Sequence, residues 1–272
     1  MKKPKEEIQL IDKYVVKANE LIQKSRFNLS LQQQKIVLYL ISQITQYDED
    51  FKLYEFSIQE FCKVCGISET GNYEELKASI KAVADKSMWV ETQQGNETLL
   101  RWIEKPYIDK HDGTIRIKLD KDMKPYLLQL KENFTSYELI WTLHFRSKYT
   151  IRMYELMKSI HFHELEEYTR EYKIDELRRL LDAEKYENWN NLKQRVIEPS
   201  INEINEYSDK NIIYEPIRKG RSIDRVRFTI TTKDSLEIEE LRDKVVKEMG
   251  YEQITLWDIM EEKGLVKKSK GN

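Results

Sequence analysis

Hydrophobic residues between Asn28 and Ile44 recur at the spacing of an amphipathic helix. Ser30 precedes the run and Gln33 follows three positions later, which is the pattern of an N-cap with a capping box. The apolar positions that share the predicted face are Leu31, Ile36, Leu40, Ile41 and Ile44. The run therefore predicts a helix that packs one side into a core.

The pattern changes several times before residue 120. Alternating residues predict a strand at 51–57, and helical spacing predicts helices at 58–66 and 71–89. Two strand-like runs within 89–109 flank Gln94, Gly95 and Asn96, a hairpin signal, and 114–120 alternates as a further strand. The order helix, strand, helix, helix, hairpin is typical of a winged helix-turn-helix domain.

A similar order of elements follows the polar break at 131–136. Helical patterns cover 147–160, 172–183 and 189–209, and a hairpin pattern covers 211–232 with Lys219 and Gly220 at its turn. The sequence therefore predicts an α+β fold of two tandem winged helix-turn-helix domains. The expected division is an N-terminal segment at 1–25, domains at 26–134 and 135–235, and a tail with one helix at 236–272.

Composition agrees with two folded domains. The chain has 272 residues, of which 40% are hydrophobic and 35% are charged. Its apolar runs are too short for a membrane span, and its first residues have no apolar stretch typical of a secretory signal. We therefore expect a cytoplasmic protein without membrane contact.

Two cysteines, Cys62 and Cys65, form one CxxC motif in a helical pattern that ends at Gly66. A structural zinc site needs four ligands, and the nearest histidine, His111, is far away in sequence. We expect two reduced cysteines on a short helix, with no metal or redox cofactor.

Charge is unevenly distributed along the chain. The formal net charge is −2, yet the segment 210–233 carries seven Lys and Arg residues against two acidic ones, and 161–183 is rich in acid. Because attraction to phosphate depends on local potential, a nearly neutral protein can carry a basic face. A solvated charged surface remains the alternative interpretation.

The predicted helix at 189–205 has one broad apolar face and one polar face. The polar face holds Asn191, Gln194 and Arg195, together with Glu198 and Asn202. Amide side chains can pair with adenine and Arg with guanine, so this face has the chemistry of major-groove recognition. An ordinary polar helix face is about as good an interpretation, and Pro199 is expected to kink or end the helix.

The hairpin that follows favours DNA binding. Arg218, Lys219 and Arg221 surround its turn, while Arg225 and Arg227 alternate along the returning strand, so the hairpin can serve as a wing that contacts phosphates. The first domain has weaker counterparts beside acidic residues. These are Asn72, Lys77 and Lys81.

A different interpretation starts from His161, Phe162 and His163, the His-hydrophobic-His signature of metal-dependent rolling-circle nickases. That chemistry needs both histidines on a strand, facing one metal. Here they continue a helical pattern, in which positions i and i+2 point about 200° apart. We therefore expect a protein that is not an enzyme.

The chain resembles the plasmid replication initiators of the Rep_3 family over roughly residues 14–233. The run from Val15 to Ile44 is similar to the family's opening helix, and 147–159 to the start of its second domain. The run 196–230 is similar to the final recognition helix and wing. The tail after Ser235 lies outside this resemblance, and its function stays open.

The resemblance implies double-stranded DNA as partner, bound at direct repeats of a replication origin. It also implies origin opening, recruitment of the host initiator ATPase and replicative helicase, autorepression, and a monomer–dimer equilibrium. By position, the resemblance assigns DNA contacts to the start of the second domain, the recognition helix and the wing turn. These residues are Ser147, Lys148, Tyr149, Arg152, Asn191, Gln194, Arg195, Gly220 and Arg221. A winged-helix transcriptional regulator or a protein-interaction module remains an alternative.

Overall fold

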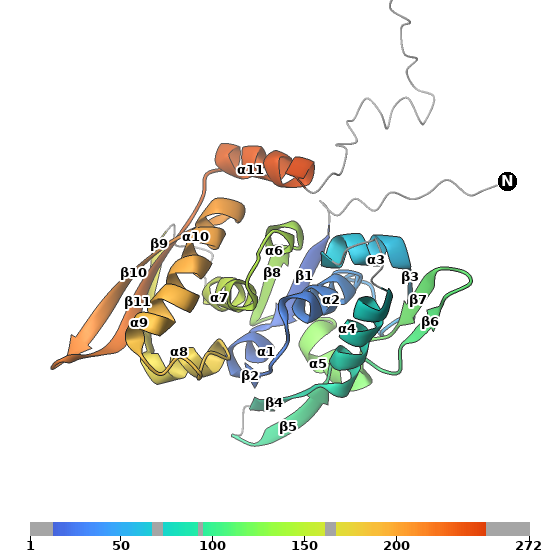
Figure 1. Cartoon of the computed structure of the whole chain (residues 1–272), viewed down its shortest axis with the longest axis horizontal. Coiled ribbons are helices and arrows are strands. Elements are labelled where there is room, and N and C mark those ends of the chain that lie inside the picture. The colour runs from blue at the N-terminus through green and yellow to red at the C-terminus, as the bar shows by residue number, and fades with distance from the viewer. Residues whose placement is uncertain (1–12, 67–72, 92–94, 161–166, 249–272) are drawn as a thin grey trace, which may run out of the picture.

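The computed structural model describes residues 13–66, 73–91, 95–160 and 167–248. In Figure 1 two groups of helices and strands lie on either side of α6 and α7. The first group consists of β1 (Tyr14–Ala18), α1 (Asn19–Lys24), β2 (Ser25–Arg26), α2 (Leu31–Ile41), β3 (Tyr54–Ser57), α3 (Ile58–Cys65), α4 (Tyr73–Asp85), β4 (Ser87–Glu91), β5 (Glu97–Arg101), β6 (Tyr107–Asp109), β7 (Thr114–Ile117), α5 (Lys124–Leu127) and β8 (Phe134–Glu138).

The linking helices are short and lead into the second group. They are α6 (Ile140–Leu143) and α7 (Lys148–Lys158). The second group consists of β9 (Glu167–Lys173), α8 (Ile174–Leu180), α9 (Trp189–Leu192), α10 (Glu198–Tyr207), β10 (Lys210–Lys219), β11 (Ser222–Thr232) and α11 (Ser235–Glu248). The expected winged-helix order is therefore present twice.

Helix α2 begins as the sequence predicts. The Ser30 side chain accepts a hydrogen bond from the backbone N–H of Gln33, and the Gln33 side chain accepts one from the backbone N–H of Ser30, which completes the capping box. The helix is buried from Gln34 to Ile41, because α3, α4, α7 and β1 all pack around it. It is the central helix of the first group.

The strands of the first group form separate small sheets. Strand β4 pairs with β5 and β2, while β3 pairs with β7 and β7 with β6. The predicted hairpin at 89–109 is confirmed for β4 and β5, but β3 pairs with β7 and not with this hairpin. The two domains therefore share an order of elements but not a strand topology.

The start of the chain departs from the expected helix. Residues 14–18 form β1, which pairs antiparallel with β8 from Tyr14 opposite Glu138 to Ala18 opposite Phe134. Only α1 and α2 of the run from Val15 to Ile44 are helical. Strand β1 belongs to the predicted N-terminal segment, and β8 lies where the two domains were expected to meet. The predicted domain boundaries at 25/26 and 134/135 stay a prediction.

The second group contains a strand that the sequence analysis missed. Strand β9 lies within the acid-rich segment and pairs antiparallel with β11, which gives the sheet order β10-β11-β9. Only Tyr168 and Tyr172 of β9 are buried. With so few apolar positions, β9 depends on its hydrogen bonds to β11 and not on its own hydrophobic pattern.

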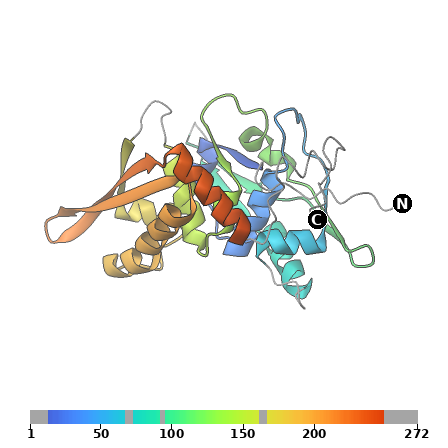
Figure 2. The ribbon, with the colours of Figure 1, turned by 90° about the horizontal axis from the view of Figure 1, so that it is seen from above.

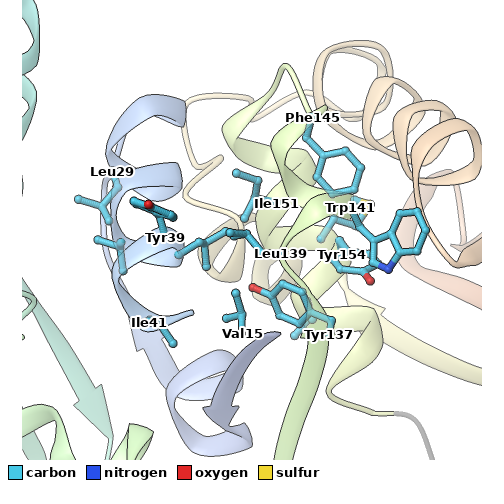
Figure 3. Packing of buried hydrophobic residues seen from close by; sticks show 14 of the residues in the cluster. Val15, Leu29, Tyr39, Ile41, Tyr137, Leu139, Trp141, Phe145, Ile151 and Tyr154 are labelled. Carbon is cyan, nitrogen blue, oxygen red and sulfur yellow. The ribbon is translucent and has the colours of Figure 1, made fainter. Parts of the chain in front are cut away.

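One hydrophobic core runs through both groups of elements. Figure 3 shows that the same cluster contains Tyr39 of α2, Val15 of β1, Tyr137 of β8 and Tyr154 of α7, with Tyr137 next to Tyr154. The rings of Tyr137 and Tyr154 meet edge to face at 5.3 Å, and Phe145 contacts Tyr154 in a similar way. Helix α7 therefore packs against elements of both domains.

Candidate nucleic-acid interface

The predicted recognition helix is continuous but not uniformly α-helical. Helix α9 passes through a π-helical turn at Lys193–Ile197 directly into α10, and the Glu198 N–H donates to the carbonyl of Lys193. Pro199 has no N–H and would crowd the carbonyl four residues earlier in a regular helix. The wider π turn just before Pro199 accommodates it, so the proline does not end the helix.

The three residues predicted to recognise bases share one environment. Asn191, Gln194 and Arg195 are all exposed, while Leu192, Val196 and Ile197 are buried. Within the described residues, none of the three exposed side chains forms a hydrogen bond or ion pair with the protein. Their polar groups are therefore available to an external partner.

Glu198 and Asn202, which were expected on the same face, differ from each other. Glu198 is half-buried, accepts a hydrogen bond from the Tyr214 hydroxyl at 3.1 Å and pairs with Lys193 at 3.4 Å. Asn202 is exposed. Glu198 therefore ties the helix to β10, and its carboxylate is already engaged.

The hairpin formed by β10 and β11 extends away from the rest of the molecule at the left of Figures 1 and 2. Its two-residue turn consists of Gly220 and Arg221 between Lys219 and Ser222. Gly220 has a φ of +66°, a conformation that favours glycine at this turn position. The turn presents Arg221 to solvent at the tip.

The five basic residues of this hairpin that were predicted to contact DNA fall into two classes. Arg218, Lys219 and Arg221 near the tip are exposed and, among the residues that the structure describes, have no carboxylate partner. Arg227 pairs with Glu171 at 2.7 Å and with Glu215 at 3.3 Å, and Arg225 pairs with Asp224 and Glu171. The basic side chains of the hairpin without a carboxylate partner among the described residues are therefore near the tip.

A groove of about 460 Å³ separates the start of α9 from the hairpin tip. Its lining includes Trp189, Asn190, Arg218 and Arg221, so it lies between the two predicted DNA-contacting elements. The lining also contains Arg178 of α8, which the sequence analysis did not single out.

Arg178 has a buried guanidinium edge. One nitrogen donates to Asp175 at 2.8 Å and another to the backbone carbonyl of Glu187, while Nε is buried without a partner. The sequence alone gives little reason to assign Arg178 to this groove. A basic residue in the last turn of a helix is common, because it interacts favourably with the helix dipole.

The basic candidates of the first domain lie on α4. Figure 2 shows α4 and the α9–α10 helix on the same side of the molecule. Lys77 and Lys81 are exposed and pair with Glu74 and Asp85 on the same helix. Asn72 lies outside the described residues. Helix α4 therefore offers less unpaired positive charge than the hairpin tip.

The expected DNA contacts at the start of α7 are mostly engaged within the protein. Ser147 caps the helix and accepts from the Tyr149 N–H, and Lys148 pairs with Asp182 at 2.5 Å. Tyr149 is buried, and burial, the largest cause, raises the pKa of its hydroxyl. The Ser147 and Lys148 side chains are half-buried and partly open to solvent, whereas the Tyr149 side chain is buried in the protein.

Arg152 requires a correction. It was expected to meet a phosphate, yet it is only 5% exposed and donates to the carbonyls of Ile22, Ser25 and Leu180. It also pairs with Glu155 at 3.5 Å. A polar position on a helix was mistaken for an exposed one, because the sequence does not show that another domain covers it. Arg152 connects α7 to α1 and α8.

Glu155 is the centre of a buried ionic cluster. It is 1% exposed, lies 2.5 Å from Lys17 of β1 and accepts a hydrogen bond from the Tyr137 hydroxyl at 2.6 Å. Burial would raise the pKa of Glu155, but Lys17 and Arg152 outweigh it and hold that pKa below its usual value. The carboxylate therefore stays charged and joins β1, β8 and α7.

The two cysteines of the CxxC motif form no metal or redox site in the described part of the chain. Cys62 and Cys65 are buried free thiols, and burial raises the pKa of Cys65, so it is held as the unreactive thiol. Among the described residues, no group of three or more His, Cys, Asp or Glu side chains could hold a metal. His161 and His163 lie outside the described residues, and so does the tail after Glu248.

A search for membrane-crossing segments gave a negative result for the described part of the chain. None of its helices combines the length and the apolar character that a bilayer span requires.

Known proteins resemble the chain over most of its length. A "Replication initiation protein" of Escherichia coli is 24% identical over 247 residues, which is 87% of this chain and 75% of that protein. The crystal structure of the Pi initiator protein in complex with iteron DNA superposes with a TM-score of 0.69 at 18% identity, covering 83% of this chain and 99% of the other.

Two family models match consecutive parts of the sequence. "Initiator Replication protein, WH1" matches residues 14–158, through the end of α7, and "Initiator Rep protein, WH2" matches residues 173–230. The first match includes α7, which the sequence interpretation had placed at the start of the second domain. The two matches span most of the chain, which therefore belongs to the Rep_3 family of plasmid replication initiators with tandem winged-helix domains.

Proposed function

We propose that this protein initiates plasmid replication by binding repeated duplex sites in the origin through both winged-helix domains. The observation that carries the proposal is the pairing of an exposed recognition face with an unneutralised wing tip. Asn191, Gln194 and Arg195 have free polar groups, and a groove separates their helix from Arg218 and Arg221. A base-reading helix beside a phosphate-binding wing is how winged helices bind duplex DNA.

The chemistry of each side chain determines whether we assign it to a base or to a phosphate. Asn191 and Gln194 offer amides suited to adenine, and Arg195 offers a guanidinium suited to guanine. Arg218, Lys219 and Arg221 contact phosphates and hold the helix in the groove, because phosphate contacts fix position and carry no sequence information. Lys77 and Lys81 make weaker phosphate contacts from the first domain, since each already has an acidic neighbour.

The kind of DNA site that we propose is inferred from the family. The Pi initiator was solved with iteron DNA, and its fold covers most of this chain, which supports repeated origin sites as the target here. As the rest of this proposal, the bound protein opens adjacent DNA, recruits the host initiator ATPase and the replicative helicase, and represses its own promoter. A monomer–dimer equilibrium separates initiation from repression, and the protein acts by binding, without catalysis.

A footprint of the full chain on DNA flanking its gene tests this proposal. Protection of several direct repeats is the expected result. Protection of one inverted repeat at a promoter would instead identify a transcriptional regulator. Phosphate contacts release counterions, so the affinity for random duplex should fall as the salt concentration rises. An affinity that does not change with salt would contradict the proposed phosphate contacts.

Incubation of supercoiled origin DNA with the protein and Mg²⁺ or Mn²⁺ tests the absence of catalysis. We expect the DNA to remain supercoiled. Nicked product that disappears in the His161→Ala variant would show that the protein is a nickase.

A further inference from the structure

Helix α11 leads from the second domain back to the domain junction. It follows β11 in the chain and lies beyond both family matches. Figure 1 shows it next to α10 of the second domain and next to α6, with which it packs. Its buried side chains are Leu241, Val245 and Val246. One side of α11 is therefore covered by the rest of the protein.

A two-point ion pair joins α11 to the first domain. The Arg242 guanidinium donates through Nε to one carboxylate oxygen of Glu138 at 3.0 Å and through Nη2 to the other at 2.6 Å. Glu138 is the last residue of β8 and lies opposite Tyr14 of β1. Its side chain is only 13% exposed. Because a forked pair of this kind fixes an angle as well as a distance, it orients α11 on the β1–β8 strand pair.

The same helix also contacts the end of the recognition helix. The Lys244 ammonium lies 3.7 Å from the Glu206 carboxylate and 5.1 Å from the ring centre of Tyr207, and both partners belong to the last turn of α10. His144, which follows α6, stacks on the Tyr207 ring and contacts the Val245 carbonyl. The recognition helix, α11 and the domain junction therefore meet around Tyr207.

Two routes of contact thus run from the first domain to α10. One is α7, which packs on α10 and carries the buried pair of Arg152 and Glu155. The other is α11, which contacts β8 through Arg242 and α10 through Lys244. A helix that packs along one neighbour can still rotate about the line of contact. A second contact away from that line opposes the rotation.

We propose that α11 is a brace that sets the angle of the α9–α10 helix relative to the first domain, with Arg242 and Glu138 as positioning residues. The brace limits the spacing of DNA contacts that the two domains can reach at once, without a contact of its own to DNA. This consequence for DNA rests on the proposed function, whereas the brace itself does not.

Distances between spin labels on the two domains test the brace in the full chain without DNA. The labels are attached at Lys105→Cys in the first domain and at Thr169→Cys on β9, because both positions are exposed. Cys62 and Cys65 are buried, and the unsubstituted chain serves as the control for their labelling. We expect one narrow distribution of distances when α11 is unchanged.

Arg242→Ala should broaden or shift this distribution, because it removes the contact to β8. Lys247→Ala is the matched control, since Lys247 is an exposed cation of the same helix. It should leave the distribution unchanged. The same narrow distribution in Arg242→Ala as in the natural chain, or an equal change in both variants, would overturn the brace.

Glu138→Ala tests the same contact from the other side. It should reproduce the effect of Arg242→Ala, and the double variant should go no further than either single one, because all three lose one interaction. Effects of the two single variants that add in the double variant would show that the ion pair is not what holds the angle. Urea denaturation of each variant verifies that it remains folded.

Titration of two origin-repeat duplexes then tests the role of the brace in site selection. One duplex has the natural repeat, and the other has two base pairs inserted between the parts that the two domains contact. The natural chain should prefer the natural spacing. Arg242→Ala should lower this preference by about two- to fivefold, the range expected for one partly exposed ion pair, while Lys247→Ala retains it.

The two kinds of measurement fail in different ways. A changed label distance with an unchanged spacing preference would refute the role of the brace in selecting DNA. Failure of the natural chain to bind any duplex would refute the proposed function and leave the label distances standing as the test of the brace.

Discussion

At the scale of single residues, the wing shows that identical side chains can differ in their readiness to bind. Arg221 projects from the turn without a carboxylate partner among the described residues, whereas Arg227 lies between Glu171 and Glu215. A phosphate that approaches Arg227 is repelled by the carboxylates of Glu171 and Glu215 and must displace them to bind the guanidinium. Proximity in sequence to the turn therefore matters less than what each guanidinium already contacts.

Arg221→Ala should weaken binding to every duplex by a similar factor and lower the salt slope by about one, because a phosphate contact carries no sequence information. Arg227→Ala is its matched control and should change affinity much less, since its charge is already neutralised. Fluorescence anisotropy with specific and random duplexes at several salt concentrations measures both. A larger loss in Arg227→Ala would contradict the division of the wing.

Arg195→Ala should lose about 1 to 3 kcal/mol of binding free energy at repeats that place a guanine under this residue. The loss should be smaller on random duplex, so the variant relaxes sequence preference. Selection of bound sequences from a randomised pool checks this. Unchanged affinity and preference would show that a different part of the helix faces the bases.

Glu155→Gln should lower the free energy of unfolding by about 3–5 kcal/mol, because it leaves Lys17 and Arg152 buried without a counter-charge. Glu132→Gln is the control, since Glu132 is exposed and the substitution is chemically the same. Urea denaturation of both variants gives the difference. Similar midpoints would mean that the buried cluster does not stabilise the domain junction.

At the scale of elements, the π turn changes which positions of the α9–α10 helix face the core. A helical wheel drawn with regular α-helical spacing does not show this change. Val196 and Ile197, the last two residues of the π turn, are both fully buried. Because a π turn holds one residue more than an α-helical turn, it shifts the buried stripe of α10 by one position relative to that of α9. The residues before the turn, including Asn191, are thus oriented by α9, and those after Pro199 by α10.

Helix α11 is attached to the rest of the molecule by a histidine that burial keeps neutral. His144 contacts the carbonyl of Val245 at 3.1 Å and stacks on Tyr207. Burial lowers its pKa more than the Val245 carbonyl and Glu248 raise it. The unfolded chain therefore binds a proton more readily than the folded one below the ordinary histidine pKa.

Stability should accordingly fall as the pH drops from neutrality through about 6.5 and further toward the lowered pKa of His144. His144→Gln should show a shallower fall over the same window. Chemical denaturation at a series of pH values compares the two chains, and the difference cancels the contribution of other groups. Parallel curves would show that His144 does not couple protonation to folding.

The sequence predicted the elements that carry their own pattern and missed those that depend on distant partners. Helix α2 has a capping box and a buried face, and the exposure of Asn191, Gln194 and Arg195 follows from the apolar residues between them. Strand β9 is mostly charged and becomes a strand by pairing with β11. Long-range pairing leaves little trace in a local pattern.

At the scale of the whole molecule, the buried contacts of α7 join the two domains into one unit. Arg152 reaches α1 and α8 from α7, and Lys17 of β1 meets Glu155. The α4 helix and the α9–α10 helix, which we propose contact DNA, lie on the same side of this unit (Figure 2). The DNA must supply its contacts at a matching distance and rotation.

Insertion of about half a helical turn into the middle of a repeat should therefore abolish simultaneous contact by both domains, because it rotates one half to the opposite side of the duplex. Affinity should fall to that of the better domain alone. Gel-shift assays with the natural and lengthened repeats measure this. Full affinity for the lengthened repeat would mean that the domains move independently.

The pairing of β1 with β8 has a consequence for the order of events during synthesis. Lys17 meets Glu155 across a sequence separation of 138 residues, so β1 leaves the ribosome long before its strand and ionic partners exist. At ordinary translation rates the wait is on the order of ten seconds. The first domain therefore cannot finish folding on the ribosome until α7 has emerged, and its earliest segment is the last to be secured.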